Sequence, residues 1–571
     1  MTDLALPPGL VLILAGLLLP VLPGLLRQAV LLAAPLLTLA AVWAVPDGPQ
    51  LVLTYLGMEI IPVQADKLTR VFATIFAIMG FAGALFSLRQ DRIAELAAAF
   101  VYAGSAIGVT FAGDVITLFV FWEVMAIAST IVVAMGPNAR GASLRYAVIH
   151  FLGGVLLMIG VAGHVFQTGS TAFGEIGLAS WPQWLIVAAV LLNAGAPPFA
   201  AWLPDAYPSS SWSGMVFLSA FTTKTSVYVL IRGFPGEEVL IGIGLFMVFY
   251  GIIMALLEND MRRILAYSIV NQVGFMVTAV GIGTPLALDG AAAHAFAHII
   301  YKALLLMSAG AVLYETGRSK CTEVGGLYRY MPVSCICGII GALAISALPL
   351  TSGFVSKSLI SSAAGYEHMF YIWLALTAAS AGVFFHAGIK FPWFVFFNRK
   401  DYLYLHEGRP KDPPWNMQAA MILLSAICIG LGIWSAPLYD LLPNGAMIKG
   451  HVYEAYTPSH VLNQLQLLFF SGLAFFLLLD WMKRTTTITL DVDWLWRGLP
   501  AVIRSMFGIG WALAWDDLVD KLEAAWNRTL GGLFRTHGPE GTLARTRPTG
   551  AMALWMTVLL CAFLLFSFFQ V

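Results

Sequence analysis

Long apolar runs alternate with short polar loops along almost the whole chain. Windows of about 20 apolar residues, the length that crosses a bilayer as a helix, predict about sixteen transmembrane helices. The first run has no basic residue before it, so we interpret it as a retained span and not as a signal peptide. We expect an all-α integral membrane protein with spans near residues 8–26, 28–45, 68–88, 94–112, 114–135, 142–168, 183–206, 212–232, 238–257, 261–282, 287–315, 331–363, 369–398, 416–437, 461–482 and 551–570.

Basic residues divide the loops between these spans into two sets. Lys and Arg accumulate in cytoplasmic loops, and here most of them follow odd-numbered spans. We therefore assign these loops to the inside and both termini to the outside. Loops after even-numbered spans are mostly acidic, with Lys67, Arg232 and Lys449 as exceptions. The basic residues that support the assignment are Arg27, Arg89, Arg92, Arg140, Arg145, Arg262, Arg263, Arg318, Lys320, Arg399, Lys400, Lys483 and Arg484.

Composition narrows the class of protein further. Of the 571 residues, 59% are hydrophobic and 11% are charged, which excludes a soluble globular protein. We therefore expect most of the chain to lie in the lipid bilayer. Lys plus Arg and Asp plus Glu both number 31, so the net charge indicates no nucleic-acid partner. The five cysteines have no spacing that holds zinc or an iron–sulfur cluster, so we expect no bound metal.

Four prolines interrupt the apolar run between the seventh and eighth predicted spans. Pro197, Pro198, Pro204 and Pro208 cannot all lie in one unbroken helix, because each lacks an N–H and crowds the carbonyl four residues earlier. Lys224 follows in the restarted helix, at a depth where an ammonium is tolerated beside water or a counter-charge. A broken helix with a buried ionisable group is typical of the mid-membrane site of a transporter.

The same pattern recurs later in the chain. Pro349 and Gly353 predict a second break, and Lys357 follows it. A repeated pattern of this kind indicates inverted repeats. His386 and Lys390 lie four residues apart in the next span. They are either a further part of the site or, for Lys390, a side chain that extends its ammonium to the cytoplasmic face.

Glu123 lies near the middle of an otherwise apolar span. A carboxylate at that depth is protonated, paired or in contact with water. Lys224 is its natural partner, and Tyr228, one turn after Lys224, is placed to hydrogen-bond the ammonium. A purely structural hydrogen bond or ion pair between helices is the alternative interpretation of these residues.

His294, His298 and Lys302 recur every four residues and therefore share one stripe of a helix. We interpret this stripe as part of a proton path, because histidine accepts and releases protons near neutral pH. A zinc site also uses histidines four residues apart, but no third ligand accompanies these two. The pattern therefore favours proton transfer over metal binding.

Other ionisable residues have simpler interpretations. His150 and His164 are lone histidines on apolar faces of the sixth span, and we interpret both as satisfied core residues. Glu258, Arg262 and Arg263 form a charged turn before the tenth span, which we expect to be solvated. A second interpretation of Arg263 is that it caps the inner mouth of a channel.

A long non-spanning segment, residues 485–550, precedes the last span. Its apolar residues recur at helical spacing among charges, which is typical of an amphipathic helix on the membrane surface. A plain connector is an equally good interpretation. The apolar residues in question are Leu499, Val502, Ile503, Met506, Leu518 and Leu522.

Seven segments together carry a family resemblance. The chain resembles the proton-conducting antiporter-like membrane subunits, a family that includes the large membrane subunits of respiratory complex I, of membrane-bound hydrogenases and of Mrp-type sodium/proton antiporters. The ordered match covers about residues 95–400. The segments are FWEVMAIAS, PPFAAWLPDAYP, TTKTSVYVLIR, ENDMRRILAYSIVNQVGFM, HAFAHIIYKALLLMSAG, EVGGLYRYMP and LPLTSGFVSKSLI.

The resemblance implies a fold and a set of site residues. The implied fold has two inverted five-helix repeats with broken helices 7 and 12. The implied proton-transfer residues are Glu123, Lys224, Lys302 and Lys357, with His294 and His298 beside the central lysine. The expected parts of the chain are 1–93 (first transmembrane helices), 94–232 and 238–398 (the two repeats), 399–484 (further transmembrane helices), 485–550 (surface segment) and 551–571 (last transmembrane helix).

The chain departs from the family pattern at two positions. Asn193 stands nine residues before Trp202, where the family commonly has a lysine. An amide cannot store a proton, so the entry path uses Lys224 or water, or is impaired. Ser358 follows Lys357 where the family has an acid, which is closer to the D-type Mrp subunit than to complex I. The last span after a long surface segment instead resembles the largest complex I subunit.

We therefore expect a proton-translocating subunit of a multisubunit sodium/proton antiporter, in a bacterial-type inner membrane and in contact with other membrane subunits. No dinucleotide fingerprint or haem-like ligand pair is present in the sequence, so we expect no cofactor and no enzyme activity of the isolated chain. Three alternatives stay open. They are a redox-driven pump subunit of a complex I or hydrogenase-like assembly, a proton-coupled inorganic-carbon uptake subunit with a zinc-binding partner, and a non-conducting scaffold.

Overall fold

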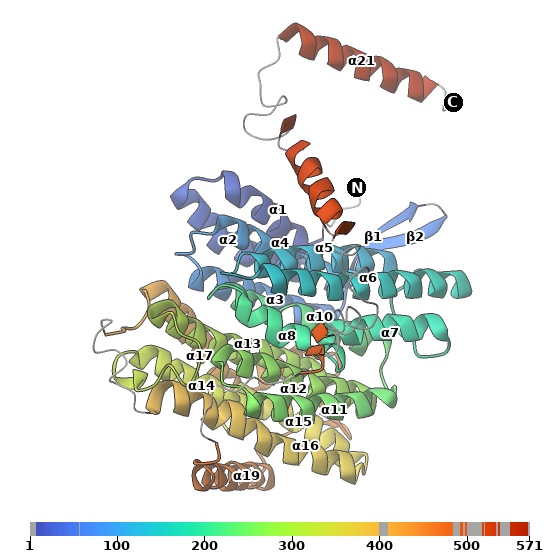
Figure 1. The fold of residues 1–571 in the computed structure, drawn as a ribbon. Helices are drawn as coiled ribbons and strands as arrows, with labels where there is room; N and C mark the ends of the chain where they lie inside the picture. The colour runs from blue at the N-terminus through green and yellow to red at the C-terminus, as the bar shows by residue number, and fades with distance from the viewer. Residues whose placement is uncertain are drawn as a thin grey trace. The chain divides into compact units, whose positions relative to one another are not determined.

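Helices that are long enough to cross a bilayer make up most of the computed structural model (Figure 1). The structure describes residues 7–55, 57–398, 409–482, 491–494, 497–498, 517–518, 520–532, 535–536 and 549–568. The chain divides into two compact units, Met1–Asp491 and Val492–Val571. The first unit contains all the candidate site residues.

The first part of this unit contains the first broken span, Trp181–Ala194 with Phe199–Ser209, and ends with the span that follows it. Its short 3-10 helices are η1 (Leu19–Val21) and η2 (Phe199–Ala201). Its helices are α1 (Gly9–Leu18), α2 (Gly24–Ala44), α3 (Lys67–Phe86), α4 (Ile93–Phe111), α5 (Val115–Ala134), α6 (Arg140–Thr168), α7 (Trp181–Ala194), α8 (Trp202–Ser209), α9 (Gly214–Leu218) and α10 (Thr222–Gly233).

The rest of the unit contains the second broken span and the helices around it. Its short 3-10 helix is η3 (Leu327–Arg329), and its π-helices are η4 (Phe384–Lys390) and η5 (Trp393–Phe397). Its α-helices are α11 (Val239–Leu257), α12 (Met261–Ile282), α13 (Pro285–Thr316), α14 (Pro332–Ile345), α15 (Ser352–Tyr366), α16 (Phe370–Val383), α17 (Trp415–Ile433), α18 (Ala436–Leu441) and α19 (Pro458–Leu477).

The predicted all-α membrane class is confirmed. In the described part of the chain, twelve helices are long and apolar enough to span a membrane, and the bent pair Trp181–Ala194 and Phe199–Ser209 makes a thirteenth. The other three predicted spans coincide with the shorter apolar helices Gly9–Val21, Pro332–Ile345 and Ala553–Ala562. Pro332–Ile345 is short because the second break divides the predicted span 331–363 into α14 and α15.

Two strands that the sequence pattern does not predict connect α2 to α3. β1 (Gly48–Tyr55) and β2 (Met58–Ala65) form an antiparallel hairpin. The register shifts twice along the pair, so the strict alternation of apolar and polar residues that reveals a strand is interrupted. A second, two-residue ladder joins β3 (Met447–Ile448) to β4 (His451–Val452).

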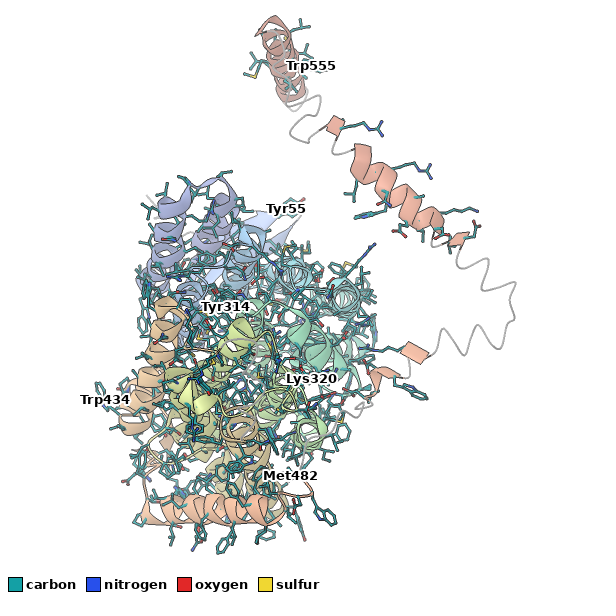
Figure 2. All side chains as sticks on the ribbon, turned by 60° about the vertical axis from the view of Figure 1, so that its left-hand side comes forward. Tyr55, Tyr314, Lys320, Trp434, Met482 and Trp555 are labelled. Atoms are coloured by element: carbon teal, nitrogen blue, oxygen red, sulfur yellow. The ribbon has the colours of Figure 1, made fainter. Side chains whose placement is uncertain are left out.

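Helix α13 lies in the middle of the first unit, with α1, α2 and α4 to one side and α15, α16 and α19 to the other (Figure 1). It packs against α3, α10, α12, α14, α15 and α17. Its apolar stretch is 94% buried, whereas those of α2 and α19 are 28% and 17% buried. Peripheral side chains such as Trp434, which is 69% exposed, point away from the bundle (Figure 2). The apolar side chains that stay exposed therefore lie at the periphery of the bundle.

The second unit contains α21 (Thr549–Phe568) and a helical stretch over residues 520–532. Most of the amphipathic segment predicted at 485–550, including Leu499, Val502, Ile503 and Met506, lies outside the described residues. The described Leu518 and Leu522 are 47% and 61% exposed.

Candidate functional site

The first helix break lies at the proline cluster, where the sequence predicts it. Helix α7 ends at Ala194 and is capped by Gly195, whose φ of +82° favours glycine. The chain continues through η2 and α8 at a bend of 41° and then through α9. It restarts as α10, which carries Lys224 in its first turn.

Lys224 binds to backbone that is freed after this bend, at the junction between α9 and α10. Its Nζ donates to the carbonyl of Ser219, 2.6 Å away, and to Thr223 Oγ1 at 3.1 Å. Ser219 is the C-cap of α9, so its carbonyl has no partner within a helix. Lys224 itself is fully buried. The broken helix therefore supplies the acceptor that a buried ammonium needs.

The second break also leaves a carbonyl that accepts a hydrogen bond from a buried lysine. Helix α14 ends at Ile345, and α15 begins at Ser352. Between them, Ala347 and Leu350 adopt positive φ angles of +57° and +72°, a conformation that costs a non-glycine residue about 1–2 kcal/mol. Lys357 Nζ donates to the carbonyl of Ile345 at 3.1 Å. A broken helix again provides the partner for the lysine that follows it.

The predicted stripe on α13 is buried in the centre of the bundle. Lys302 Nζ donates to Ser268 Oγ of α12 at 2.8 Å and to the carbonyl of Leu265 at 3.3 Å. His298 lies one turn earlier, and neither of its ring nitrogens has a hydrogen-bond partner among the described residues. Its ring packs edge-on against Tyr301, with 5.3 Å between centroids. The centre of the molecule therefore holds a lysine beside an unpaired imidazole.

His294 connects this stripe to the second break. Its Nδ1 is 3.1 Å from Ser356 Oγ, next to Lys357 in the chain, and its Nε2 is 3.1 Å from Gln272 Oε1. The rings of His294 and His298 lie 6.3 Å apart. These contacts place both histidines between the central lysine and Lys357.

Buried lysines lie within electrostatic range of both histidines. Lys224 lies within electrostatic range of Lys302 and of both histidines, and Lys357 lies within range of His294 and His298. Helices α10, α13 and α15 therefore bring Lys224, His298, Lys302, His294 and Lys357 into one buried row.

Glu123 is not part of this direct contact. It is half-buried on α5, and its Oε1 has no hydrogen-bond partner among the described residues. No ion pair joins Glu123 to Lys224, although the structure describes both, so the predicted direct pairing is wrong. The carboxylate instead lies against Gly154 of α6, where a Cβ atom would overlap Oε1. Glu123 lies on α5 and Lys224 on α10. The distance between them depends on how these helices pack, which the local sequence does not reveal.

Polar groups from α6 and α7 lie near Glu123 and extend toward Lys224. Asn193 is fully buried, and both polar atoms of its side chain lack a hydrogen-bond partner among the described residues. His150 faces Asn193 and stacks on Tyr146 at 4.0 Å between centroids. The Tyr146 hydroxyl faces Thr222, two residues before Lys224. His150 and Tyr146 are therefore candidate relay residues.

The two lone histidines differ in their surroundings. His150 is buried against Tyr146 and Trp202, and its Nε2 has no hydrogen-bond partner among the described residues. His164 Nδ1 lies 3.0 Å from Gln183 Nε2, as expected for a satisfied core residue. The difference arises because α7 presents an unpaired amide to His150 and a partner to His164.

Tyr228 and Lys390 have partners other than those predicted. The Tyr228 hydroxyl donates to the carbonyl of Thr110 at 2.6 Å and does not reach Lys224. Lys390 is fully buried and donates to three carbonyls at the end of α11, including that of Ala255 at 2.6 Å. Its charge there stabilises the C-terminal end of a helix.

His386 lies on the π-helix η4 and not on the regular helix that the sequence predicts for 369–398. Such irregular turns frequently occur at functional sites. Its Nδ1 is 2.8 Å from the Gly382 carbonyl, and Lys302 and Lys357 lie within electrostatic range. His386 therefore belongs to the surroundings of the buried row.

The charged turn before α12 is only partly solvated. Arg263 forms an ion pair with Glu258 at 2.9 Å. Burial raises the pKa of Glu258, an effect that Arg263 partly offsets. Arg262, by contrast, is buried and donates to the carbonyls of Pro208, in the last turn of α8, and Ser211, just after it. The expectation of a solvated turn is therefore wrong for Arg262, which holds the end of the first broken span.

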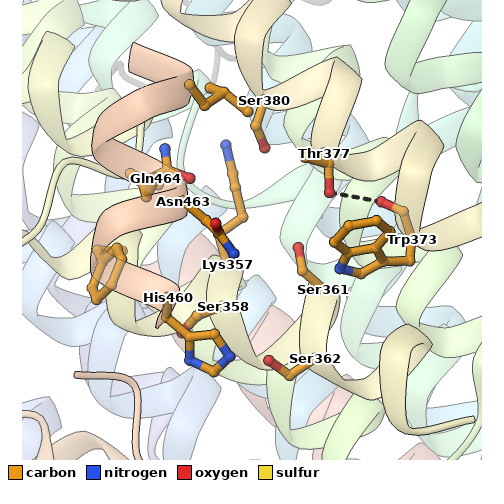
Figure 3. Close-up of a pocket in the computed structure, with 13 residues that line it drawn as sticks. Lys357, Ser358, Ser361, Ser362, Trp373, Thr377, Ser380, His460, Asn463 and Gln464 are labelled. Atoms are coloured by element: carbon orange, nitrogen blue, oxygen red, sulfur yellow. Dashed lines mark hydrogen bonds between the residues drawn. The ribbon is translucent and has the colours of Figure 1, made fainter. Parts of the chain in front are cut away.

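A polar cavity of about 110 Å³ extends from Lys357 between α15, α16 and α19. Figure 3 shows the Lys357 amino group between Gln464 and Ser380, with His460 and Ser362 nearer the other end. Gln464 Nε2 donates to the carbonyl of Ser346 at the second break, 2.9 Å away. The lining residues are Ala347, Phe354, Lys357, Ser358, Ser361, Ser362, Trp373, Thr377, Ser380, His460, Asn463, Gln464 and Leu467.

The residues that α19 contributes to this cavity are absent from the sequence-based site. The signal that reveals them is the spacing of His460, Asn463 and Gln464, which places three polar side chains on one face of the helix.

Comparisons with known proteins agree on one family. The family model described as "NADH:quinone oxidoreductase/Mrp antiporter, TM" matches residues 112–382. The D-type subunit of the Na(+)/H(+) antiporter of Alkalihalophilus pseudofirmus is 31% identical over 362 residues, which are 58% of this chain and 71% of that protein.

Two more distant similarities extend the picture. The A/B-type subunit of a probable K(+)/H(+) antiporter of Rhizobium meliloti is 27% identical over 401 residues, 65% of this chain, which spans only 40% of that protein's length. A chain of the Mrp complex from Dietzia sp. DQ12-45-1b has a similar fold, with a TM-score of 0.67, 19% identity, and coverage of 82% of this chain and 99% of that chain.

Proposed function

We propose a function from one premise: this chain belongs to the NADH:quinone oxidoreductase/Mrp antiporter transmembrane family. It is an antiporter-like, proton-conducting membrane subunit of that family, and its fold is found in a multisubunit membrane complex. We propose further that it is the proton-translocating subunit of a monovalent cation/proton antiporter, with sodium as the counter-ion, in a bacterial-type inner membrane.

The observation that carries this proposal is the buried row of Lys224, His298, Lys302, His294 and Lys357. Each ammonium is hydrogen-bonded to neutral acceptors and none is in an ion pair with a described carboxylate. Like charges repel strongly where the dielectric is low. A proton on one lysine therefore disfavours a proton on the next, which favours stepwise transfer along the row.

The proposed path begins at Glu123 and continues past Asn193 to Lys224. Because no contact joins Glu123 to Lys224, the proton passes between them through water or through the polar groups of His150 and Tyr146. It then follows Lys302, assisted by His298 and His294, to Lys357. Moving one elementary charge across the membrane changes its free energy by about 2.3 kcal/mol per 100 mV of membrane potential. An ungated path would dissipate this energy, so the path must be gated.

The proposed architecture has two inverted repeats, residues 94–232 and 238–398. The two breaks support it, because α7/α8 and α14/α15 occupy corresponding places in the two ranges and each precedes a lysine bound to a freed carbonyl. A pair of interrupted helices in corresponding positions is typical of inverted-repeat transporters. The helices before residue 93 and after residue 399, with the surface segment 485–550 and last span 551–571, are additions to this core.

Exchange in everted membrane vesicles tests the proposal. We expect Lys302→Ala and Glu123→Gln each to abolish sodium-dependent proton movement, because each removes a proton-binding group from the path, while the amount of inserted protein is unchanged. Lys320→Gln is the control, since this lysine is 54% exposed in a loop and far less buried than Lys302. Near-normal exchange in either site variant rejects the path and favours a non-conducting scaffold.

The family description also names a redox-driven complex, in which the same buried row serves a different energy source. The chains that co-purify with the tagged protein from its native membrane distinguish the two assemblies. Antiporter subunits support the proposal, whereas subunits with iron–sulfur clusters place this chain in a redox-driven pump.

A further inference from the structure

The cavity beside Lys357 differs from the rest of the buried row because it leads out of the bundle. Lys357 itself is 3% exposed, whereas Asn463, on the α19 side of the cavity, is exposed. Hydroxyl, amide and imidazole groups from α15, α16 and α19 line the space between them. Polar groups on helices at membrane depth are costly unless they are hydrogen-bonded or hydrated. A volume of about 110 Å³ is large enough for several water molecules.

His460 is held in a defined position on the α19 side of this cavity. Its Nδ1 lies 3.3 Å from the hydroxyl of Tyr453, which lies 2.8 Å from Ser362 Oγ on α15. The rings of Tyr453 and His460 stack with 5.9 Å between centroids. An imidazole fixed in this way is suited to accept a proton on one ring nitrogen and release it from the other.

We propose that this cavity is the aqueous mouth through which Lys357 exchanges protons with one side of the membrane, and that His460 is the proton-transfer residue at that mouth. The ligand of the cavity is water and the ion that it carries is the proton. The proposal rests on the proposed function and adds to it a role for α19, a helix outside both proposed repeats.

The arrangement of α19 supports this role. Its apolar residues pack against the π-helix region, for example Phe476 against Trp393 at 5.1 Å and Phe475 against Phe385 at 5.9 Å. Its polar residues at positions 460, 463 and 464 face the cavity instead. Gln464 has a structural partner in the Ser346 carbonyl.

Thiol accessibility tests the aqueous mouth without reference to transport. The background is Cys561→Ser, because Cys561 is exposed and the other four cysteines are buried. A membrane-impermeant thiosulfonate reacts with thiolates, which form only in contact with water. We expect Ser361→Cys, on the cavity wall, to react from the same side of the membrane as Glu454→Cys, an exposed reference residue near the mouth. Ala364→Cys, fully buried on the same helix, should stay unreactive.

Exchange rates test the role of His460. We expect His460→Gln, which keeps a hydrogen-bonding group but no exchangeable proton, to slow sodium-dependent proton movement about tenfold. His460→Glu should restore most of the rate, because a carboxyl group can again transfer a proton. Gln466→Ala is the matched control, since Gln466 is exposed on the same helix and does not line the cavity.

The outcomes distinguish the aqueous mouth and the role of His460 from the proposed antiporter function. An unreactive Ser361→Cys beside a reactive Glu454→Cys overturns the aqueous mouth. A normal rate in His460→Gln, or no recovery in His460→Glu, overturns the role of His460. If the parent protein shows no exchange at all while Ser361→Cys reacts, the antiporter function fails and the water-filled cavity stands.

Discussion

The lysine that follows each helix break donates to a carbonyl freed from a helix, but the two lysines differ in their access to water. Lys224 donates to the carbonyl of Ser219, at the α9/α10 junction that follows the first break, and Lys357 donates to the carbonyl of Ile345, at the second break itself. Lys224 is enclosed on all sides by α10 and its neighbours α3, α4, α7, α12 and α13. Lys357 lines a polar cavity that α15, α16 and α19 form together. A broken helix therefore creates the partner of a buried lysine, whereas the surrounding helices decide whether water reaches it.

The buried row must both hold a proton in the interior and pass it to the surface, and the two lysines suit these two tasks differently. A lysine enclosed in protein can hold a proton in the interior, away from the membrane surface. A lysine beside a polar cavity can pass its proton to the surface. The structure assigns the enclosed position to the first break and the accessible position to the second, although the local sequences of the two breaks share the same pattern.

The largest effect is expected from replacing these two lysines by cysteine in the Cys561→Ser background. Lys224→Cys and Lys357→Cys should each reduce exchange about 100-fold or more, since each removes a proton-binding group. Treatment with 2-aminoethyl methanethiosulfonate adds an ammonium to an accessible thiol. We expect recovered exchange only in Lys357→Cys, because only that position lines the cavity.

A thiosulfonate that carries a sulfonate is the control for this recovery and should restore nothing. Equal recovery of the two cysteine variants would contradict the contrast between an enclosed and an accessible lysine.

A smaller effect, on stability, is expected at the second break itself. A Cβ atom on Gly353 would overlap the backbone carbonyl of Ala344, which cannot rotate away. Gly353→Ala should therefore lower the free energy of unfolding by about 1–3 kcal/mol, seen as a lower Tm of the purified protein in detergent. Gly365→Ala, on the same helix, has its nearest neighbour at 3.8 Å and should leave the Tm unchanged or higher. Equal Tm values for the two variants would show that the break tolerates a wider separation.

The smallest effect is expected beside Glu123. A Cβ on Gly154 would overlap the Glu123 carboxylate, which can rotate away at a cost of about 0.5–1.5 kcal/mol. Gly154→Ala should slow exchange about tenfold and change the Tm little, because only the carboxylate moves. Gly153→Ala is the matched neighbour, with its nearest contacts at 3.4 Å, and should exchange at nearly the parent rate. Indistinguishable rates in the two variants would mean that the position of the carboxylate does not matter.

Much of the candidate site could be predicted from the sequence because it depends on local chemistry. Prolines break helices wherever they lie, and a charged residue inside an apolar run is exceptional in any fold. Lys224, Lys302 and Lys357 therefore stand out without a structure. The four-residue spacing of His294 and His298 likewise places them on one helix face before any packing is known.

Contacts between distant segments could not be predicted in this way. The Tyr228 hydroxyl binds the Thr110 carbonyl, 118 residues away, and not the lysine one turn before it. Lys390 binds carbonyls at the end of α11, 132–135 residues earlier. The irregular hairpin of β1 and β2 and the π-helix η4 likewise depend on pairing and packing that local periodicity does not reveal.

The amino-acid sequence by itself determined which segments span the membrane, where two of them break and which proton-binding groups lie inside, because hydropathy, proline geometry and charge act through neighbours along the chain. Only the tertiary structure decided that Glu123 stands apart from Lys224, that His150 faces Asn193 and that α19 leaves a polar cavity at Lys357. These features depend on how helices pack across the bundle. The choice of partner for a buried polar group is settled there, where an unpaired group costs about 1–3 kcal/mol.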